Sequence, residues 1–422
     1  MVLFGFGDRE ALRILIYEHV SSGGYSGESI PPSLLCEGYA MLRGLTEDFK
    51  ASGYEVTVLL DARIAALHPP LNADCIVKIA GQEEADSSMD TAAKDADAVY
   101  VVAPEYNHVL KSIVEGIEAR GPLSLNVQSL AIDRAADKSS LGVRAKSLGL
   151  NFPKTKTCSV IDVPENVAEL IDDELGFPVV IKPSKGASCC GLSVVKTHKD
   201  VAGALAKVRS ESTGDQAYIQ EYVGGVPVSV SLVCTGAEAL PVSLNLQEII
   251  LAGPNAVSSY DGGTIPFKHP LGVEAFSSAK SLVESFEGGL HGYVGVDFVL
   301  SEDKATVIEV NPRLTTSYVG LRRVARFNVA QSILKALSKN ELPKKSQTKG
   351  YACFSKLAIH RPETYACLDL WESSVIASPP FPLTENGGSY ALVQSYGKTS
   401  AEASYGVSEA KKRLLQINNG AE

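Results

Sequence analysis

The sequence predicts a protein of mixed α/β and α+β class, with a doubly wound parallel sheet at its N-terminal end. Three observations lead to this class. Apolar strand-like runs alternate with helical stretches up to residue 127. Paired β-branched runs, typical of antiparallel hairpins, dominate the middle of the chain. After residue 343 several short strand-like runs follow one another, which predicts a small C-terminal β-rich extension.

The length of the chain indicates more than one domain. Its 422 residues exceed what one hydrophobic core usually organises, so two or three domains are expected. We place a Rossmann-like parallel-sheet domain at residues 1–135 and an α+β domain at 136–342, with a lid subdomain at about 151–222. A basic linker then opens a C-terminal β-rich domain at 343–422.

Composition and charge exclude several classes of protein. The chain is 45% hydrophobic and 21% charged, as ordinary globular proteins are, and its net charge of −10 argues against binding to nucleic acid. No apolar run is long enough to span a membrane, and the short apolar stretch Met1–Gly7 is not a secretory signal. The eight cysteines show no CxxC pair, so we expect reduced thiols in a cytoplasmic protein. Whether it forms a homo-oligomer stays open.

The first domain supplies the parallel sheet. Its predicted strands are Arg13–Val20, Val56–Leu60, Asp74–Ile79, Ala98–Ala103 and Leu123–Val127, and its predicted helices are about Pro32–Ser52 and Asn107–Arg120. Ligands of such sheets bind at the carboxyl ends of the strands, which makes the loop at Gly23-Gly24 and the stretch Pro104–Asn107 candidates for substrate contact. The glycines could equally serve only to turn the chain. The absence of GxGxxG argues against a dinucleotide.

A lysine beside a small-residue loop marks a candidate phosphate site in the second domain. The apolar strand 176–183 carries Lys182 near its end, the loop 184–191 is rich in Ser, Gly and Ala, and Leu192–Lys196 is the return strand. Such loops leave backbone N–H groups free to bind phosphate, and the lysine adds a positive charge. A flexible surface hairpin is the alternative, but the apolar strand that carries Lys182 favours the phosphate site.

Further elements follow along the chain. The predicted helices are Ser139–Leu148, Pro164–Leu175, Phe276–Gly288, Thr315–Ser338 and Ser400–Gln416; the predicted strands are Ala217–Val223, Val228–Cys234, one within Pro241–Ile250, Tyr351–His360, Ser374–Ala377 and Tyr390–Gly397. Ser139 or Ser140 is expected to cap the first of these helices. The loop Leu251–Pro270 is too long for a simple turn, so it is a candidate for lining a substrate site.

The stretch 294–314 predicts a metal-binding hairpin. If it folds symmetrically about Asp303, Asp297 lies opposite Glu309 on one face, and Asn311 shares that face. Directly opposed carboxylates destabilise a sheet unless a cation lies between them, and Mg²⁺ binds one or two carboxylates together with water and phosphate oxygens. An exposed hairpin with solvated charges is the alternative. Glu309 and Asn311 interrupt an otherwise apolar strand, which favours the metal.

In their order and spacing, these residues resemble the ATP-grasp superfamily. The resemblance covers about residues 130–325, and it depends on Lys138, Ile181-Lys182-Pro183, Gln220-Glu221-Tyr222-Val223, Asp297 and Glu309-x-Asn311-x-Arg313. It implies an ATP-grasp fold, in which two α+β lobes close on ATP behind a pre-ATP-grasp domain. Where many members have a glutamate that contacts ribose, this chain has Val226-Pro227-Val228-Ser229.

The resemblance also implies roles for individual residues. Arg313 and Lys182 would be catalytic, with Arg313 next to an acyl phosphate. The nucleotide-binding residues would be Lys138, Lys182, Ser184 and Ser188 for the phosphates and loop, and Glu221 and Val223 for the adenine hinge; the ligands of Mg²⁺ or Mn²⁺ would be Asp297, Glu309 and Asn311.

The activity implied is that of an ATP-dependent carboxylate–amine ligase with small-molecule amino acid and amine substrates. More narrowly, Ile16–Gly24 and Asn311–Arg322 resemble archaeal-type ligases that join tyramine to glutamate. Arg322 and Arg323 are then candidate cations for a dicarboxylic substrate, with a solvated helix face as the alternative, and Tyr25 and Tyr260 could line an aromatic slot. Rival interpretations are a ligase of another amino-acid, peptide or purine pathway and a catalytically silent nucleotide-binding regulator.

Overall fold

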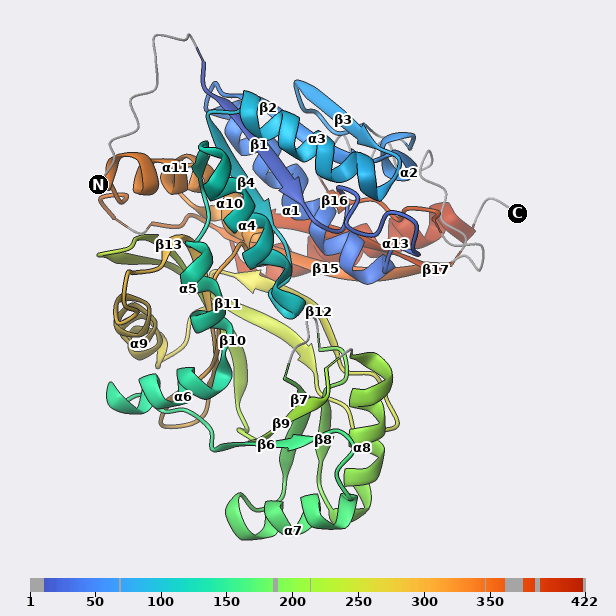
Figure 1. The fold of residues 1–422 in the computed structure, drawn as a ribbon, viewed down its shortest axis with the longest axis vertical. Coiled ribbons are helices and arrows are strands. Elements are labelled where there is room, and N and C mark those ends of the chain that lie inside the picture. The colour runs from blue at the N-terminus through green and yellow to red at the C-terminus, as the bar shows by residue number, and fades with distance from the viewer. Residues whose placement is uncertain are drawn as a thin grey trace.

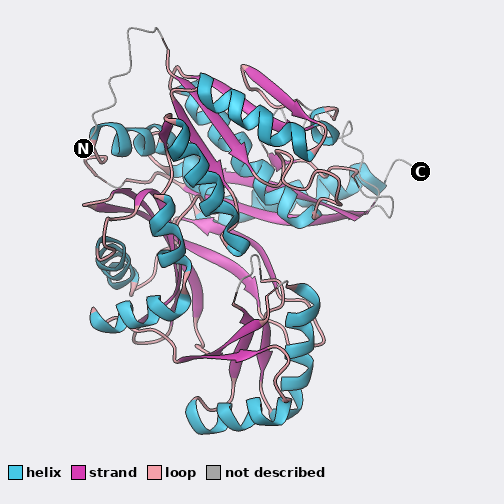
Figure 2. Ribbon diagram, viewed as in Figure 1, coloured by secondary structure: helices cyan, strands magenta, loops and turns pink. Residues whose placement is uncertain are grey.

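The computed structural model describes residues 11–67, 70–184, 189–212, 214–345, 347–360, 375–383 and 388–419. Their strands form three sheets, of five, eight and four strands. Figure 1 shows the five-stranded sheet and the C-terminal strands in one large body, and the four-stranded sheet in a lobe below it. Figure 2 shows that helices pack against each of these sheets.

The five-stranded sheet is parallel, with the order β3-β2-β1-β4-β5. Alternate residues of β1 face opposite sides: Ile14 and Ile16 share a core with α1, whereas Leu15 and Tyr17 share one with α3 and α4. Helices on both faces confirm the doubly wound sheet. The elements are β1 (Arg13–Glu18), α1 (Pro32–Ala51), β2 (Glu55–Asp61), α2 (Ala62–Ala65), β3 (Cys75–Ile79), α3 (Gln82–Asp95), β4 (Ala98–Val102), η1 (Tyr106–His108), α4 (Val109–Arg120) and β5 (Leu123–Ser124).

The four-stranded sheet is antiparallel, with the order β6-β9-β7-β8. Helices α7 and α8 cover one face, where Ile181 and Ile219 are fully buried. Because side chains alternate along a strand, Lys182 and Gln220 face the opposite side. The elements that follow β5, up to the end of this sheet, are α5 (Ser129–Ala136), α6 (Lys138–Ser147), β6 (Thr155–Ser159), α7 (Pro164–Glu174), β7 (Val179–Pro183), β8 (Ser193–Val195), α8 (His198–Glu211) and β9 (Gln216–Glu221).

The eight-stranded sheet has the order β14-β13-β10-β11-β12-β15-β17-β16. Helix α9 packs on one face, and α10 and α11 pack on the other. The three C-terminal strands therefore extend a sheet that begins in the middle of the chain, and α13 covers β15 and β17. The elements are β10 (Val226–Thr235), β11 (Ala239–Ile250), β12 (Ser259–Ile265), α9 (Gly272–Glu284), β13 (His291–Leu300), β14 (Ala305–Asn311), α10 (Tyr318–Val324), α11 (Val329–Lys339), β15 (Tyr351–His360), β16 (Ile376–Ser378), β17 (Gly388–Gly397) and α13 (Ser400–Asn419).

The structure corrects three local predictions. The stretch 315–338 is two helices rather than one, and the Asn328 side chain caps the second by accepting from the Gln331 N–H at 2.9 Å. The predicted loop Leu251–Pro270 contains the strand β12. Helix α6 is capped by Asp137, whose carboxylate accepts the backbone N–H groups of Ser139 and Ser140. Asp caps a helix as well as Ser does, and the carboxylate precedes the two serines.

Several elements were missed, and the predicted domain division is not tested by the structure. The elements α3, α5, α8 and β6 were not predicted. The C-terminal strands share a sheet with the strands before them. The division of the chain into domains at residues 135 and 342 stays a prediction. Within the described ranges, no helix is long and apolar enough to cross a membrane.

Candidate active site

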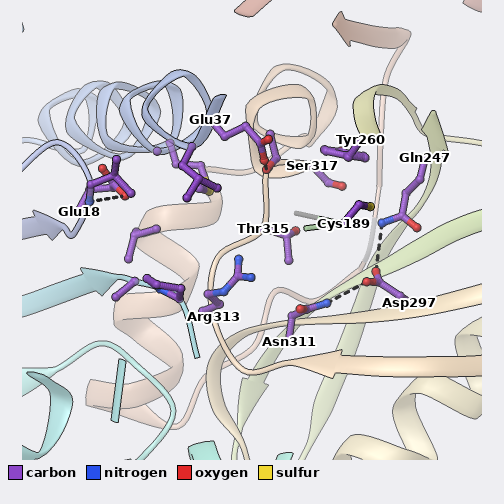
Figure 3. Close-up of a pocket in the computed structure, with 18 of the residues that line it drawn as sticks. Glu18, Glu37, Cys189, Gln247, Tyr260, Asp297, Asn311, Arg313, Thr315 and Ser317 are labelled. Carbon is purple, nitrogen blue, oxygen red and sulfur yellow. Dashed lines mark hydrogen bonds between the residues drawn. The ribbon is translucent and has the colours of Figure 1, made fainter. Parts of the chain in front are cut away.

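Two carboxylates face each other on the predicted hairpin. Asp297 on β13 pairs in register with Glu309 on β14, as predicted, and Asn311 pairs with Gly295. A bulge at Ile308 lies beside this pair, since Phe298 pairs with Val307 and not with Ile308. The Asn311 amide donates to Asp297 at 3.0 Å and the Gln247 amide donates to it at 3.2 Å (Figure 3).

The two carboxylates differ in their electrostatic environment. Burial and the nearby charge of Glu309 raise the pKa of Asp297 well above its ordinary value. The ammonium group of Lys138 holds the pKa of Glu309 below its ordinary value and outweighs the effect of burial. Lys138 Nζ lies 2.9 Å from a carboxylate oxygen of Glu309. The pair is thus stabilised by one lysine and by amide donors.

This donor set fits a divalent cation. Asp297, Glu309 and Asn311 bring carboxylate and amide oxygens to one buried face, and among the described residues no group of three or more His, Cys, Asp or Glu side chains could hold a metal elsewhere. Two carboxylates leave coordination positions for water and phosphate oxygens, which is how Mg²⁺ is usually bound in phosphoryl-transfer enzymes. Without such a cation, Lys138 balances the charge of Glu309, and the pKa of Asp297 is raised.

Two lysines approach the hairpin from different elements. Lys138 is the first residue of α6, and Lys182 lies on β7 in the four-stranded sheet. Lys182 Nζ donates to the Gln220 side chain at 2.8 Å. Burial and the charge of Lys138 lower the pKa of Lys182 to about 8. Two buried ammonium groups so close together indicate a site for an anionic ligand.

The lysines and the hairpin line one cleft with a volume of about 930 Å³. Of the residues that sequence analysis assigned to a nucleotide, Lys138, Lys182, Ser184 and Val223 line this cleft. Glu221 is exposed and does not line it, and its carboxylate accepts the backbone N–H of Lys154 at 3.3 Å. Ser188 lies outside the described residues.

Arg313 stands at the junction of this cleft with a smaller cavity. Its Nε lies 2.9 Å from the carboxylate of Glu105, which follows β4 at the carboxyl edge of the parallel sheet. Both side chains are largely buried, and burial would lower the pKa of Arg313 if the charge of Glu105 did not outweigh it. The parallel sheet and the metal hairpin are thereby joined at the site.

Three side chains that form ion pairs or hydrogen bonds with these site residues were not predicted as partners from the sequence. Glu105 lies in the stretch Pro104–Asn107, whose position at a strand end was the signal for it. Gln220 interrupts an otherwise apolar strand, which is a weaker signal of the same kind as that for Glu309. Gln247 gave no signal, because only the pairing of β11 with β10, and of β10 with β13, brings it to Asp297.

The predictions for substrate-binding side chains meet mixed outcomes. The structure contradicts the assignment of Arg322, because its guanidinium pairs with Asp48 at 2.6 Å and with Glu47 at 3.0 Å, both on α1. Arg323 is exposed and lines neither cavity of the site. Tyr260 does line the smaller cavity, whereas Tyr25 bonds to Tyr106 through the two hydroxyls at 2.9 Å.

Comparison with known families agrees with this arrangement. Residues 135–317 match the model of the ATP-grasp domain, and residues 54–132 match that of the pre ATP-grasp 3 domain. Together the two matches span more than half of the chain, which is therefore a member of the ATP-grasp superfamily with a pre-ATP-grasp domain. It is an ATP-grasp ligase.

Two curated proteins are similar to this chain over most of its length. They are the tyramine–L-glutamate ligases of Methanocaldococcus fervens and Methanocaldococcus jannaschii, each 28% identical to this chain over 80% of its length. The matches cover 98% of the first relative and 92% of the second.

Solved structures share the fold. A biotin carboxylase from Campylobacter jejuni superposes with a TM-score of 0.72 at 16% identity, covering 96% of this chain and 92% of that one. An N5-carboxyaminoimidazole ribonucleotide synthetase from Thermotoga maritima has a TM-score of 0.62 at 17% identity, covering 96% and 98%. At this identity the likeness establishes the fold.

Proposed function

We propose that the protein is an ATP-dependent carboxylate–amine ligase that works through an acyl phosphate. One observation carries the proposal. Lys138, Lys182 and Arg313 come from three different elements and surround the paired carboxylates Asp297 and Glu309 in one cleft. Three buried cations beside two opposed carboxylates suit a polyphosphate with a divalent cation.

Lys138 and Lys182 contact the phosphates of ATP in this proposal, together with Ser184, which lines the same cleft. Ser188, assigned with it from the sequence, lies outside the described residues. Both lysines line the cleft and both are buried, so their charges act in a medium of low dielectric constant. The adenine lies near Val223, which lines the cleft at the crossing from β9 to β10. Glu221, assigned to the same hinge, lies outside the cleft lining and donates its backbone N–H to the Lys154 carbonyl at 2.9 Å.

Asp297, Glu309 and Asn311 hold Mg²⁺, or Mn²⁺ in its place. When bound, the cation neutralises charge that builds up between the donor and acceptor oxygens during phosphoryl transfer. In the structure Lys138 forms an ion pair with the carboxylate of Glu309, and the side-chain amide of Asn311 donates a hydrogen bond to Asp297. Binding of the cation to these oxygens would replace both contacts, which would leave Lys138 free to bind phosphate.

The reaction needs positioning and electrostatic stabilisation more than a nucleophile from the protein. ATP phosphorylates the substrate carboxylate, an amine attacks the acyl carbon, and phosphate leaves. Arg313, fixed by Glu105, is placed to stabilise the negative charge of the acyl phosphate and of the tetrahedral intermediate. The lobe that carries β7 and β8 closes over the cleft and keeps water from the acyl phosphate.

Glutamate and tyramine are the substrates we propose first. The support is the printed activity of the two curated relatives, whose length is almost fully covered by the match. No residue that would recognise the glutamate side chain was predicted correctly, since Arg322 is committed to Asp48. The substrate pair therefore depends on the relatives, whereas the ligase chemistry depends on the site.

The test is a reaction of the full-length protein with ATP, MgCl₂, glutamate and tyramine, followed by mass spectrometry for the amide and by an assay for ADP. Omission of each component and the Glu309→Gln variant serve as controls. We expect amide and ADP in equal amounts, and neither in any control. If only another acid–amine pair releases ADP, the ligase chemistry stands and the substrate pair is wrong. If no pair releases ADP, the proposed function fails.

A further inference from the structure

A smaller cavity adjoins the paired carboxylates. It has a volume of about 200 Å³ and shares Asp297, Glu309, Asn311 and Arg313 with the large cleft. From there it extends between the end of β1 and helix α1, and Figure 3 shows Glu18 on the far side of Arg313 from Asp297. A ligand in this cavity would reach the reacting end of the nucleotide site.

Two carboxylates from the N-terminal domain line the cavity, and their partners differ. Glu37 on α1 pairs with Lys356 Nζ at 2.7 Å and accepts the hydroxyl of Thr316 at 2.8 Å, so its charge is balanced. Glu18 makes no ion pair with any described residue. It accepts only neutral donors, namely the Val20 N–H at 3.2 Å and the Ser21 N–H and hydroxyl at 2.8 Å and 2.6 Å.

The carboxylate of Glu18 is held in place without an ion-pair partner among the described residues, although Arg313 lies near enough for its charge to act on Glu18. Its side chain is 2% exposed, and helix α1 packs directly on it. A Cβ atom on Gly38 would lie 2.4 Å from a carboxylate oxygen of Glu18, so only glycine allows this approach. A buried carboxylate without a cation is costly, and a positively charged ligand would offset that cost.

Part of the cavity wall is apolar. Val20, Leu34 and Met41 line the cavity. Figure 3 shows the ring of Tyr260 well away from Glu18. A buried carboxylate without an ion-pair partner, next to apolar wall residues, suits a ligand with a short apolar body and one ammonium group. A carboxylate next to that ammonium group would be repelled by Glu18, so an amino acid should fit less well than the corresponding amine.

We infer that this cavity is the acceptor site, and that Glu18 holds the ammonium group of the incoming primary amine and accepts the proton that this group must lose before its nitrogen can attack the acyl carbon. The inference rests on the proposed ligase function, to which it adds the location and the chemical class of the amine. Glu18 is then a specificity-determining residue, which selects an amine over both a neutral analogue and an amino acid.

The titration of Glu18 is consistent with this role. Burial raises its pKa to about 7, against the opposing effects of the Ser21 and Val20 donors and of Arg313. The titratable groups near it are Tyr17 and His19 on the same segment and Tyr25 in the following loop, and all three are neutral at pH 7, because burial raises the tyrosine pKa values and lowers that of His19 to about 4. Glu18 therefore changes charge near neutral pH.

The test is calorimetric titration of the full-length protein in the presence of MgADP at pH 8. The probes are tyramine, tyrosol, which carries a hydroxyl in place of the ammonium group, and tyrosine. The variants are Glu18→Gln, Glu18→Asp and, as a matched control, Glu28→Gln, since Glu28 is an exposed glutamate of the loop that follows β1. Thermal unfolding of each variant checks the fold.

Wild type and Glu28→Gln should bind tyramine at least about tenfold more tightly than tyrosol or tyrosine. Glu18→Gln should bind tyramine and tyrosol about equally, and Glu18→Asp should retain part of the preference. The inference is overturned if wild type shows no preference or if Glu18→Gln keeps it; should Glu18→Gln not fold, Glu18→Asp with an unreduced preference overturns it.

The same proteins separate this inference from the proposed function. Selective binding of tyramine without amide formation supports the ammonium site and contradicts the ligase substrates. Amide formation with an unchanged KM for tyramine in Glu18→Gln supports the ligase and contradicts the assignment of Glu18.

Discussion

At the scale of single residues, the site balances its charges with its own side chains. Lys138 neutralises Glu309, Glu105 neutralises Arg313, and two amides donate to Asp297. Asp297, Glu309 and Asn311 could be predicted because polar residues at every second position of an apolar strand mark one face. Glu105 and Gln247 could not be assigned as partners, because the contacts join strands that are distant in sequence.

The first prediction concerns the metal carboxylate. Glu309→Gln should lower turnover by at least about 100-fold and weaken Mg²⁺-dependent ATP binding, because the amide lacks the charge that binds the cation. Steady-state kinetics and titration with Mn²⁺, followed by electron paramagnetic resonance, measure the two effects. Glu302→Gln is the matched control, since Glu302 is exposed in the turn of the same hairpin and should behave as wild type. Full activity of Glu309→Gln would contradict the metal assignment.

The second prediction concerns the pH dependence of ATP binding. Burial and Lys138 lower the pKa of Lys182 to about 8 in the free protein. The ammonium form therefore predominates below about pH 8 and is lost as the pH rises through this value. The kcat/KM for ATP should fall above pH 8, by up to about tenfold per pH unit for a group that must be protonated.

Two variants of Lys182 make the assignment specific. Lys182→Arg keeps its charge at high pH and should lose the decline, whereas Lys182→Ala should have a low kcat/KM at every pH. A decline that persists unchanged in Lys182→Arg would show that another group titrates.

At the scale of elements, periodicity predicted the strands and long helices that have one buried stripe, such as β1, β13, α1 and α13. Helix α3 was missed because it has few apolar residues and buries only three side chains. The prediction of one helix over 315–338 failed because both halves are apolar, and the break between them depends on the cap at Asn328. Helix ends are decided by single hydrogen bonds, which composition does not reveal.

The third prediction tests the corrected cap of α6. Asp137→Ala should destabilise the helix start by about 1 kcal/mol, because the N–H groups of Ser139 and Ser140 lose their acceptor. Lys138 is the first residue of this helix, so the KM for ATP should rise by about three- to tenfold as its position loosens. Ser139→Ala should change neither the thermal unfolding midpoint nor the KM. If Asp137→Ala and Ser139→Ala have equal effects, the assignment of Asp137 as the cap of α6 is wrong.

At the scale of the whole molecule, the C-terminal strands are part of the body that forms the site. Ala352 and Phe354 of β15 share a core with Tyr39 and Leu42 of α1. Lys356 of β15 pairs with Glu37, and Arg43 of α1 donates to the backbone carbonyl of Ile376 in β16. The sequence predicted strands here but also a separate domain, because the pattern of a strand does not reveal which sheet it joins.

The fourth prediction follows from this arrangement. A chain that ends after residue 345 should fail to fold into a stable, soluble protein. Its loss would leave the edge of β12 without the partner that now pairs with Gly262–Ile265, and it would expose the apolar face of α1 to water. A chain that ends after Asn419 is the control, because it keeps every described element.

Soluble yield, thermal unfolding and binding of a hydrophobic dye measure the outcome. If the shorter chain unfolds cooperatively at the same temperature as the control, the C-terminal segment is an independent domain, as the division at residue 342 predicts. If it aggregates or binds the dye strongly, the chain from β1 to β17 is one cooperative structure.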